Sequence, residues 1–559
     1  MQRLSLLFPS ALFPSARSRF EEHAAWRSET LALAASVFFA LFCNLPLWRA
    51  LLAGRQADSP STWGYAAALF VALVALQFVL LALVVTRRTA KPLLTLLLAT
   101  TAAAAYYMHK YGVFFDSTMV RNVLRTDVAE ARELVDVGLI VQLMLGALLP
   151  SLLLWRLPVR SQPVLGAFVR RIGVIVLGVA VAIGALLLVF QDISSKIRNE
   201  RQVRFLVTPA NYVWSMFDVL LADTRGAQRP REVVGADATL GPRWDGRGRP
   251  ALLVIVVGET VRAMNWGLNG YARQTTPQLA RRDDVINFPD VTSCGTNTES
   301  SLPCLFSPWG RKHYDEGRIR NAESLLNVFR HAGIDVLWRD NQSGCKGVCT
   351  GIEQQTLSKS GDRQLCDGER CLDEILLRGL PEWLAAQQGP QVLVLHQLGN
   401  HGPAYYKRYP PAFRRFTPSC DSADLQQCSR EQIVNAYDNA ILYTDHLLGQ
   451  LIGLLQSHAE TLDSAVIYVS DHGESLGESG LFLHGVPYPI APSEQTRVPM
   501  IMWFSSGFAP SFGLDLACLH GQAAQHWSHD NLFHTALGLL DVRTAVHDPS
   551  MDLSASCRH

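Results

Sequence analysis

The sequence predicts a membrane domain of five transmembrane helices followed by a soluble α/β domain with a mostly parallel central sheet. Three observations support this. Long apolar runs are confined to the first 190 residues, strand-like and helix-like segments alternate from residue 251 on, and ten of the eleven cysteines lie after residue 290. We expect a membrane domain over 1–190, a connecting segment over 191–249 and a soluble domain over 250–559. The net charge of +1 gives no indication of nucleic-acid binding.

Five stretches are long and apolar enough to cross a bilayer, which takes roughly 20 residues per helix. They are Thr30–Leu52, Thr62–Thr86, Pro92–Met108, Val137–Leu157 and Ile172–Phe190. The third is the weakest, because it is short and rich in Ala and Thr. One or two of them would alternatively be buried helices of a soluble domain, but five such stretches in one chain disfavour that interpretation.

Basic side chains flank these spans asymmetrically. They precede the first span (Arg3, Arg17, Arg19, Arg27), join the second to the third (Arg87, Arg88, Lys91) and lie between the fourth and fifth (Arg156, Arg160, Arg170, Arg171). The loop after the third span is acidic instead. The positive-inside rule therefore puts the N-terminus in the cytoplasm and everything after Phe190 outside it. The first residues lack the pattern of a cleavable signal peptide.

The cysteines on the predicted outer side form four close pairs: Cys294/Cys304, Cys345/Cys349, Cys366/Cys371 and Cys420/Cys428. In a reducing compartment, the second and third pairs would indicate zinc sites. Because the predicted topology places them outside the cytoplasm, we expect short-range disulfides. Cys518 and Cys557 are candidates for a fifth bridge, although spacing alone does not fix their pairing.

The connecting segment contains an aromatic and apolar stretch, Phe205–Leu221, with few charges. It predicts either a helix at the membrane surface or a short packed connector helix. The Gly/Arg/Pro-rich stretch Arg225–Pro250 then reads as a linker.

From Ala251 on, apolar runs typical of buried strands alternate with helical patterns. The runs are Leu252–Val257, Asp335–Trp338, Val392–Leu395, Ala465–Val469 and Val498–Phe504, and the clearest helices are Ser324–His331 and Glu431–His458. This alternation predicts an α/β domain with a mostly parallel sheet. Ligands of such sheets gather at the carboxyl ends of the strands.

Three of these predicted strands run directly into polar residues of metal-ligand type. Glu259 follows the first, His396 and His401 follow the third, and Asp471 and His472 follow the fourth, with His484 twelve residues beyond. A carboxylate from one strand and an Asp-His pair from another would supply three ligands to one divalent cation. Oxygen-rich ligation with one imidazole fits Zn²⁺, and Mn²⁺ is the alternative.

A hydroxyl-rich segment, Ser293–Cys304, has a cysteine near each end and contains Thr298. Its hydroxyl would complete a tetrahedral ligand set, and coordination lowers the pKa of an oxygen ligand enough to produce a nucleophile near neutral pH. Each feature also has a structural reading: an Asp-His-Gly turn is common, Glu259 would cap a helix, and a Thr/Ser-rich segment is usually only a loop. Their combination favours a metal-activated threonine.

Five segments carry a family resemblance: VVGET, SCGTNTESSLPC, WRDNQSGCKGVC, HQLGNHGPAYYKRYP and SDHGESLGESGLFLHG. They closely resemble the membrane-bound phosphoethanolamine transferases, which include lipid A transferases and mobile colistin-resistance enzymes. These belong to the alkaline phosphatase and sulfatase superfamily, so the resemblance implies an alkaline-phosphatase-like soluble domain. It covers nearly the whole chain.

The resemblance implies transfer of phosphoethanolamine from phosphatidylethanolamine to a phosphate group of lipid A, through a phosphoethanolamine-threonine intermediate. The product carries less negative charge, which implies resistance to polymyxins. It also implies a monomer in the bacterial inner membrane with its catalytic domain in the periplasm. Two alternatives stay open. One is transfer of phosphoethanolamine or phosphoglycerol to lipopolysaccharide core sugars, other glycans or proteins, and the other is a non-catalytic membrane sensor or scaffold.

Carried over by motif, the resemblance also implies residue roles. Thr298, not Thr296, would be the nucleophile, and Glu259, Thr298, Asp471 and His472 would hold one tightly bound Zn²⁺. His401 and His484 would contact the transferred phosphate, assist proton transfer or bind a second zinc. Lys346, with Ser343 nearby, would add positive charge to the phosphate.

The membrane half would contribute to donor binding. Asn122, Thr126 and Glu130 are four residues apart and would share one face of a helix. The resemblance places them against the donor's head group, with Glu130 facing the ethanolamine ammonium. Without the resemblance, a solvated polar helix face is the simpler interpretation. His396 would be either a packed residue or one that supports the residues of the site.

Overall fold

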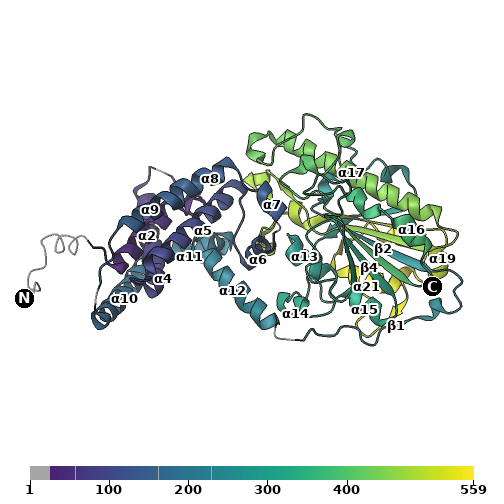
Figure 1. The fold of residues 1–559 in the computed structure, drawn as a ribbon, viewed down its shortest axis with the longest axis horizontal. Coiled ribbons are helices and arrows are strands. Elements are labelled where there is room, and N and C mark those ends of the chain that lie inside the picture. Colours follow the sequence, from purple (N-terminus) through teal and green to yellow (C-terminus); the bar gives the residue numbers. More distant parts are fainter. Residues whose placement is uncertain (1–24, 57, 127, 162, 200, 228–229) are drawn as a thin grey trace, which may run out of the picture. The chain divides into compact units, whose positions relative to one another are not determined.

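The computed structural model describes residues 25–56, 58–126, 128–161, 163–199, 201–227 and 230–559 (Figure 1). Arg3, Arg17 and Arg19, and with them the expected lack of a signal peptide, fall outside the described residues. The chain separates into two compact units. The first comprises the described residues up to Lys110 together with Val137–Val213, and the second comprises Tyr111–Asp136 and Trp214–His559. The domain boundaries expected from the sequence stay a prediction.

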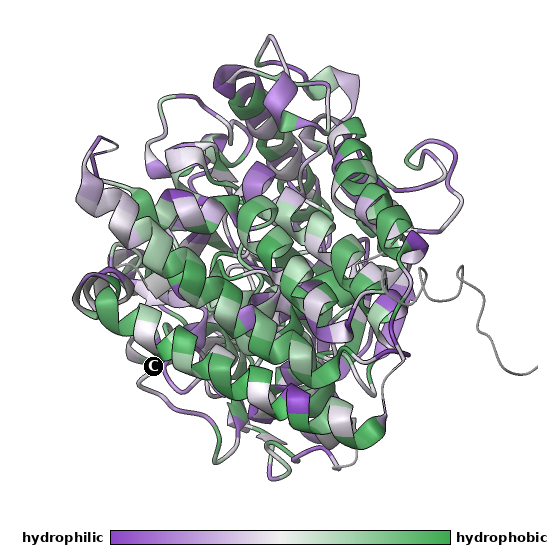
Figure 2. Ribbon diagram, turned by 90° about the vertical axis from the view of Figure 1, so that its left-hand side faces the viewer, coloured by the Kyte–Doolittle hydropathy of each residue, from purple (hydrophilic) through white to green (hydrophobic). Residues whose placement is uncertain are grey.

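The first unit is helical. Its main helices are α2 (Ser28–Phe42), α3 (Leu45–Leu52), α4 (Pro60–Val84), α5 (Ala90–Tyr111), the continuous stretch Val137–Arg156, which contains α8 (Val137–Leu143) and α9 (Leu149–Arg156), α10 (Val164–Leu188) and α11 (Phe190–Asn199). Among the described residues, α4, Val137–Arg156 and α10 are long and apolar enough to span a membrane, and α2 with α3 makes a fourth if the bent pair is one span. Figure 2 shows the apolar character of the long helices in green. Length and hydropathy therefore support three or four of the five expected spans among the described residues.

The bend between α2 and α3 measures 59° and has a local cause. Pro46 stands in the first turn of α3, where a proline removes a backbone donor and clashes with the preceding turn. The buried Asn44 side chain lies at the bend, and its Nδ2 donates to the carbonyls of Phe39 and Thr208. These two bonds tie the bend to the segment around Thr208.

The structure adds detail to the two segments that the sequence predicts as a connector helix and a linker. The aromatic stretch forms α12 (Ala210–Ala227), which starts after Pro209 rather than at Phe205. Part of the expected linker is ordered, because β1 (Thr239–Leu240) pairs with β12 (Val542–Arg543). Backbone pairing with a strand much later in the sequence leaves no local composition signal. The linker over Arg225–Pro250 stays a prediction.

The expectation that Asn122, Thr126 and Glu130 share one face of a continuous helix is wrong. Helix α6 (Ser117–Arg125) ends before Thr126, whose backbone is extended, and α7 (Val128–Glu133) is a separate helix. The Thr126 hydroxyl donates to the Asn122 carbonyl, 2.8 Å away. This local bond gives a carbonyl of the last helical turn a partner and competes with continuation of the helix.

The second unit is built on an eight-stranded sheet with the order β11-β3-β10-β7-β2-β6-β4-β5. The strands are β2 (Ala251–Gly258), β3 (Val285–Thr292), β4 (Asp335–Asp340), β5 (Glu353–Thr356), β6 (Gln391–His396), β7 (Asp463–Ser470), β10 (Arg497–Phe504) and β11 (Trp527–Ser528). The sheet is mixed, because β10 runs antiparallel to both β3 and β7 while the other neighbouring pairs are parallel. Every residue of β2 and β7 is buried, as their continuous apolar runs predict.

Helices cover both faces of this sheet. Helix α17 (Arg430–Ser457) lies across one face, and α13 (Thr298–Leu305), α15 (Leu325–His331) and α21 (Asp530–Leu539) lie on the other (Figure 1). Disulfides join all ten cysteines of this unit: Cys294–Cys304, Cys345–Cys349, Cys366–Cys371, Cys420–Cys428 and Cys518–Cys557. The bridge from Cys294 to Cys304 clamps α13 to the loop before it.

Candidate active site

The register of two central strands brings a carboxylate pair together. Strands β2 and β7 are parallel neighbours, and Gly258 lies opposite Ser470 at their carboxyl ends. The next residue of each strand, Glu259 and Asp471, therefore emerges at the same point of the sheet edge. Both side chains are fully buried, and the Asp471 backbone N–H donates to the Gly258 carbonyl.

His472 and Thr298 complete this cluster. Ligand atoms of Glu259, Asp471 and His472 all lie within 4.8 Å of one another. The Thr298 Oγ1 lies 3.1 and 3.2 Å from the two carboxylate oxygens of Glu259 and 3.4 Å from the Nε2 of His472. The Nδ1 of His472 donates to the Gly473 carbonyl, 2.9 Å away, so Nε2 is the ring nitrogen that faces the cluster.

The cluster has the properties of a cation site. The buried Oδ2 atom of Asp471 accepts no hydrogen bond from the described residues, and its ion-pair contact is the Nε2 of His472, 3.3 Å away. Burial and the neighbouring Glu259 raise the pKa of Asp471 to about 6. Burial alone would lower the pKa of His472, but the two carboxylates raise it to about 9. Two buried carboxylates this close together are costly without a neighbouring cation, so the donor set of three oxygens and one imidazole nitrogen fits Zn²⁺.

The backbone around Thr298 is held in several places. Asn297 caps α13 through a 3.0 Å bond from the Ser300 N–H, so Thr298 is the first residue of the helix. The hydroxyl of Thr296 points elsewhere and donates to the Val486 carbonyl, 2.7 Å away. This geometry distinguishes the two threonines of the segment, because only the Thr298 hydroxyl contacts the cluster.

A second group of polar residues lies next to the cluster. The His472 and His484 rings are 4.3 Å apart and the His401 and His484 rings 5.9 Å apart. The Nε2 of His401 lies 3.3 Å from a carboxylate oxygen of Glu130, and His484 Nδ1 lies 2.8 Å from Glu474. Burial alone would raise the pKa of Glu130, but the charge of His401 and its hydrogen bond lower it to about 2. The structure thus brings His401, His484 and Glu130 together.

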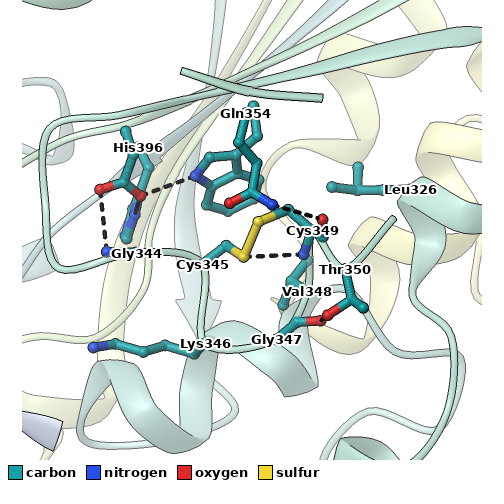
Figure 3. Close-up of a disulfide and its surroundings, with 12 residues drawn as sticks. Leu326, Gly344, Cys345, Lys346, Gly347, Val348, Cys349, Thr350, Gln354 and His396 are labelled. Carbon is teal, nitrogen blue, oxygen red and sulfur yellow. Dashed lines mark hydrogen bonds and ion pairs between the residues drawn. A yellow bond between two sulfur atoms is a disulfide. The ribbon is translucent and has the colours of Figure 1, made fainter. Parts of the chain in front are cut away.

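Lys346 and Ser343 lie on the loop after β4. Lys346 Nζ donates to the Ser343 hydroxyl at 2.7 Å and lies 3.9 Å from the buried Glu299 carboxylate. The Cys345–Cys349 disulfide closes this loop, and the Lys346 side chain extends away from the bridge (Figure 3). Asn122 and Thr126 are half-buried and are not joined to this group by any hydrogen bond recorded between described residues.

Several residues of the site leave little trace in the sequence. Gln342 donates to Glu259 at 3.2 Å and so links the Lys346 loop to the cluster. Glu474 holds His484, and Glu299 pairs with Arg320 at 3.0 Å and with Arg125. Glu299 follows Thr298 directly in the sequence, but no spacing pattern indicates that it pairs with Arg125 and Arg320. His396 bonds to Asp340 at 2.9 Å and is fully buried, which agrees with a packed residue.

Chemically, the site presents a threonine hydroxyl to a cluster of metal-ligand side chains. The imidazole of His484 lies next to that of His472, and Lys346 lies 3.9 Å from Glu299, the residue that follows Thr298. Such an arrangement suits attack by an alcohol on an anionic phosphorus centre, where positive charge offsets the charge of the reacting group.

Comparisons with known proteins agree with this chemistry. A family model described as Sulfatase matches residues 251–542, and one described as Phosphoethanolamine transferase EptA/EptB matches residues 73–224. The chain is 36% identical over 541 residues to phosphoethanolamine transferase EptA of Escherichia coli strain K12, covering 94% of this chain and 96% of that protein. It is 37% identical over 468 residues to phosphatidylethanolamine transferase Mcr-1 of Escherichia coli, covering 82% and 84% of the two chains.

A solved structure covers almost the same extent. The integral membrane protein lipooligosaccharide phosphoethanolamine transferase A of Neisseria meningitidis superposes with a TM-score of 0.91 at 36% identity, over 95% of this chain and 99% of that one.

Proposed function

This chain belongs to the phosphoethanolamine transferase family, and we propose that it transfers phosphoethanolamine from phosphatidylethanolamine to a phosphate group of lipid A. The observation that carries the proposal is the Thr298 hydroxyl, placed 3.1 Å from Glu259 inside a buried cluster of metal-ligand side chains. The names of the relatives support phosphoethanolamine as the transferred group, and the position of the Thr298 hydroxyl supports Thr298 as the nucleophile.

One Zn²⁺ would be held by Glu259, Thr298, Asp471 and His472. When bound, the cation lowers the pKa of the hydroxyl and offsets the negative charge of the donor phosphate. The full burial of Glu259 and Asp471 and the close spacing of the ligand atoms support this assignment. A second zinc at His401 and His484 is the alternative role of those histidines.

In the first step, the Thr298 oxygen forms a bond to the phosphorus of phosphatidylethanolamine. The bond between that phosphorus and the diacylglycerol oxygen breaks, and the hydroxyl proton of Thr298 ends on diacylglycerol. Lys346 and Ser343 bind the phosphate oxygens, and His401 and His484 carry the proton. Glu130, with its lowered pKa, is ionised and pairs with the ethanolamine ammonium.

In the second step, a phosphate oxygen of lipid A attacks the phosphorus of the Thr298 phosphodiester. A phosphorus-oxygen-phosphorus bond forms, the bond to Thr298 breaks, and Thr298 regains a proton. The transfer is therefore ping-pong. The product phosphate carries an added ammonium group, so the acceptor is less anionic and binds cationic peptides such as polymyxins less strongly.

Both substrates are membrane lipids, which accounts for a membrane domain. We propose that α5 is the fifth span, that the N-terminus is cytoplasmic and that the second unit lies in the periplasm, attached to the inner membrane of a bacterium. Polar side chains and the basic last turn of α5 lower its mean hydropathy, but a helix of 22 residues is long enough to cross. The protein acts as a monomer. Asn122 and Thr126 lie near the head group of the bound donor lipid.

The test is mass spectrometry of lipid A from cells that express the chain or its Thr298→Ala variant. We expect a phosphoethanolamine adduct with the first only, and a raised polymyxin inhibitory concentration with it. An adduct made equally well by Thr298→Ala would overturn the mechanism. A folded, zinc-loaded protein that leaves lipid A unmodified would move the acceptor to core sugars or other periplasmic glycans.

A further inference from the structure

A cavity of about 570 Å³ lies in the second unit beside the nucleophile helix. Its walls come from α6, from the second half of α12, from the region of α14 (Glu316–Arg320) and from the Ser343–Gly347 loop. Ser343 and Lys346 belong to this wall, so the cavity adjoins the proposed contacts of the transferred phosphate. None of the roles proposed above uses the remaining wall.

Four basic side chains line this cavity: Arg121, Arg125, Arg320 and Lys346. The buried Glu299, next to Thr298 in the chain, organises three of them. It pairs with Arg125, with Arg320 at 3.0 Å and with Lys346 at 3.9 Å. The Glu299 carboxylate is inaccessible to solvent, so it acts as a fixed anchor for cations that project into the cavity.

Arg121 has spare hydrogen-bonding capacity. Its side chain is only 4% exposed, and its Nε atom has no hydrogen-bond partner among the described residues. Its guanidinium pairs with Glu316, a residue also bound by Arg320 at 2.9 Å. A buried guanidinium with an unused donor in a cavity wall points to an anionic ligand with several acceptor oxygens.

A carboxylate already bridges two of these arginines. Asp223 of α12 lies 3.1 Å from Nη2 of Arg121 and 3.5 Å from Nη2 of Arg125. Its side chain is 43% exposed, whereas Glu299 is fully buried and Glu316 is 26% exposed. Asp223 is therefore the carboxylate of this network that can turn away most readily.

We propose that this cavity binds the phosphate group of the acceptor lipid, between Arg121 and Arg125, in the place that the Asp223 carboxylate takes in this structure. A phosphate monoester offers three oxygens to two guanidinium groups, which is the geometry that arginine forks recognise. The inference rests on the proposed function and assigns its second substrate a site next to Thr298. The head group of the donor lipid still contacts Glu130 and His401, which lie outside this cavity wall.

Exposed apolar side chains on the two helices that line the cavity fit a lipid rather than a soluble phosphate. Helix α12, which supplies Asp218 and Asp223 to the wall, also exposes Trp214, Phe217 and Leu220, and α6 exposes Val123 and Leu124. Charged residues that bind a phosphate, flanked by exposed apolar side chains, suit an acceptor whose phosphate is carried on an acylated sugar.

The two half-reactions separate this proposal from a structural role. The full-length protein in detergent is first incubated with phosphatidylethanolamine, and diacylglycerol release and the mass gain of the protein report the first step. Purified lipid A is then added, and loss of the adduct reports the second. For Arg125→Gln we expect the acceptor concentration at half-maximal rate to rise about tenfold or more, as for loss of a charged hydrogen bond. Diacylglycerol release should change much less, and Arg125→Lys should recover part of the loss.

A second variant, Asp223→Asn, should shift the half-maximal lipid A concentration in the opposite direction, which makes it the more decisive test. Asp223→Asn removes the competing carboxylate, so we expect the half-maximal lipid A concentration to fall about two- to fivefold, the range for an exposed ion pair. Asp218→Asn is the matched control, because Asp218 lies on the same helix and the same cavity wall but bonds to Ser117 at 2.7 Å. Arg318→Gln is the control for arginine loss, since Arg318 pairs with Glu232 instead.

Each outcome decides. Opposite shifts for Arg125→Gln and Asp223→Asn, confined to the second step, support the acceptor site. A rise for both variants, or an equal effect of Arg125→Gln on diacylglycerol release, would overturn it, because broken ion pairs would then explain the data. Competition by inorganic phosphate as effective as lipid A would replace the lipid by a free phosphate ligand. Absence of any adduct in the unsubstituted protein would instead overturn the proposed function, and this inference with it.

Discussion

His529 connects the nucleophile loop to the strand that carries two of the cluster's ligands, and it can do so only when it is neutral. Its Nδ1 accepts a bond from the Cys294 N–H at 3.1 Å, and its Nε2 donates to the Ser470 carbonyl at 3.0 Å. A proton on Nδ1 would face the Cys294 N–H. Burial lowers the pKa of His529 to about 3. We therefore predict that acid destabilises the second unit through this residue.

The size of the effect follows from linkage. An unfolded histidine has a pKa of about 6.5, so below that pH the unfolded chain binds a proton that the folded chain refuses. The stability contributed by neutral His529 is complete above pH 6.5 and falls as the pH decreases toward about 3. Between pH 7 and pH 5, this single residue lowers the free energy of unfolding by about 2 kcal/mol.

The assay is urea unfolding of the full-length protein in detergent at pH 7 and pH 5, followed by tryptophan fluorescence, beside His529→Asn. Asparagine does not titrate, and the bonds it loses cost the same free energy at both pH values. The unsubstituted protein should lose about 2 kcal/mol more than the variant between the two pH values. Equal losses in the two proteins would refute the reasoning.

Three further perturbations follow from the same contacts. Asp471→Asn removes a ligand from the cluster, so zinc per purified protein, measured by elemental analysis, should fall well below the unsubstituted value. Replacing Cys294 and Cys304 together by serine opens a loop of ten residues, which should lower the free energy of unfolding by about 3 kcal/mol in urea titrations without reductant. Glu133→Gln takes the 2.6 Å partner from the fully buried Arg408, and should cost about 3–5 kcal/mol by the same measurement.

Each of these has an outcome that contradicts it. Unchanged zinc in Asp471→Asn would remove that residue from the metal site. Unfolding of the double serine variant at the unsubstituted urea concentration would mean that the rest of the loop's contacts already fix it. Arg132→Gln, which breaks an exposed pair with Glu369, is the control for Glu133→Gln and should cost less than about 1 kcal/mol.

The central part of the fold is readable from the sequence because its signals are local. The apolar runs that form β2 and β7 are wholly buried, and parallel strands buried on both faces read as continuous apolar segments. Strand β3 has no such signal, because Pro289 and Asp290 interrupt it near the sheet's edge. Its antiparallel pairing with β10 therefore appears only in the structure, and makes the sheet mixed.

The site likewise contains residues that the sequence predicts and residues that only the structure brings together. Glu259, Asp471 and His472 follow predicted strands directly, so their meeting at one sheet edge can be inferred from position alone. Glu299 gains its meaning from Arg125, 174 residues earlier in the chain. Ion pairs of this kind depend on how separate segments pack, and neither spacing nor composition encodes that packing.

The most direct test of the account is the identity of the modified residue. The purified protein is incubated with phosphatidylethanolamine in the absence of acceptor, digested, and its peptides are analysed by fragmentation mass spectrometry. We expect phosphoethanolamine on Thr298 and none on Thr296, with the adduct lost when lipid A is added. An adduct on another residue, or transfer to lipid A with no adduct on Thr298 at any time, would contradict the account.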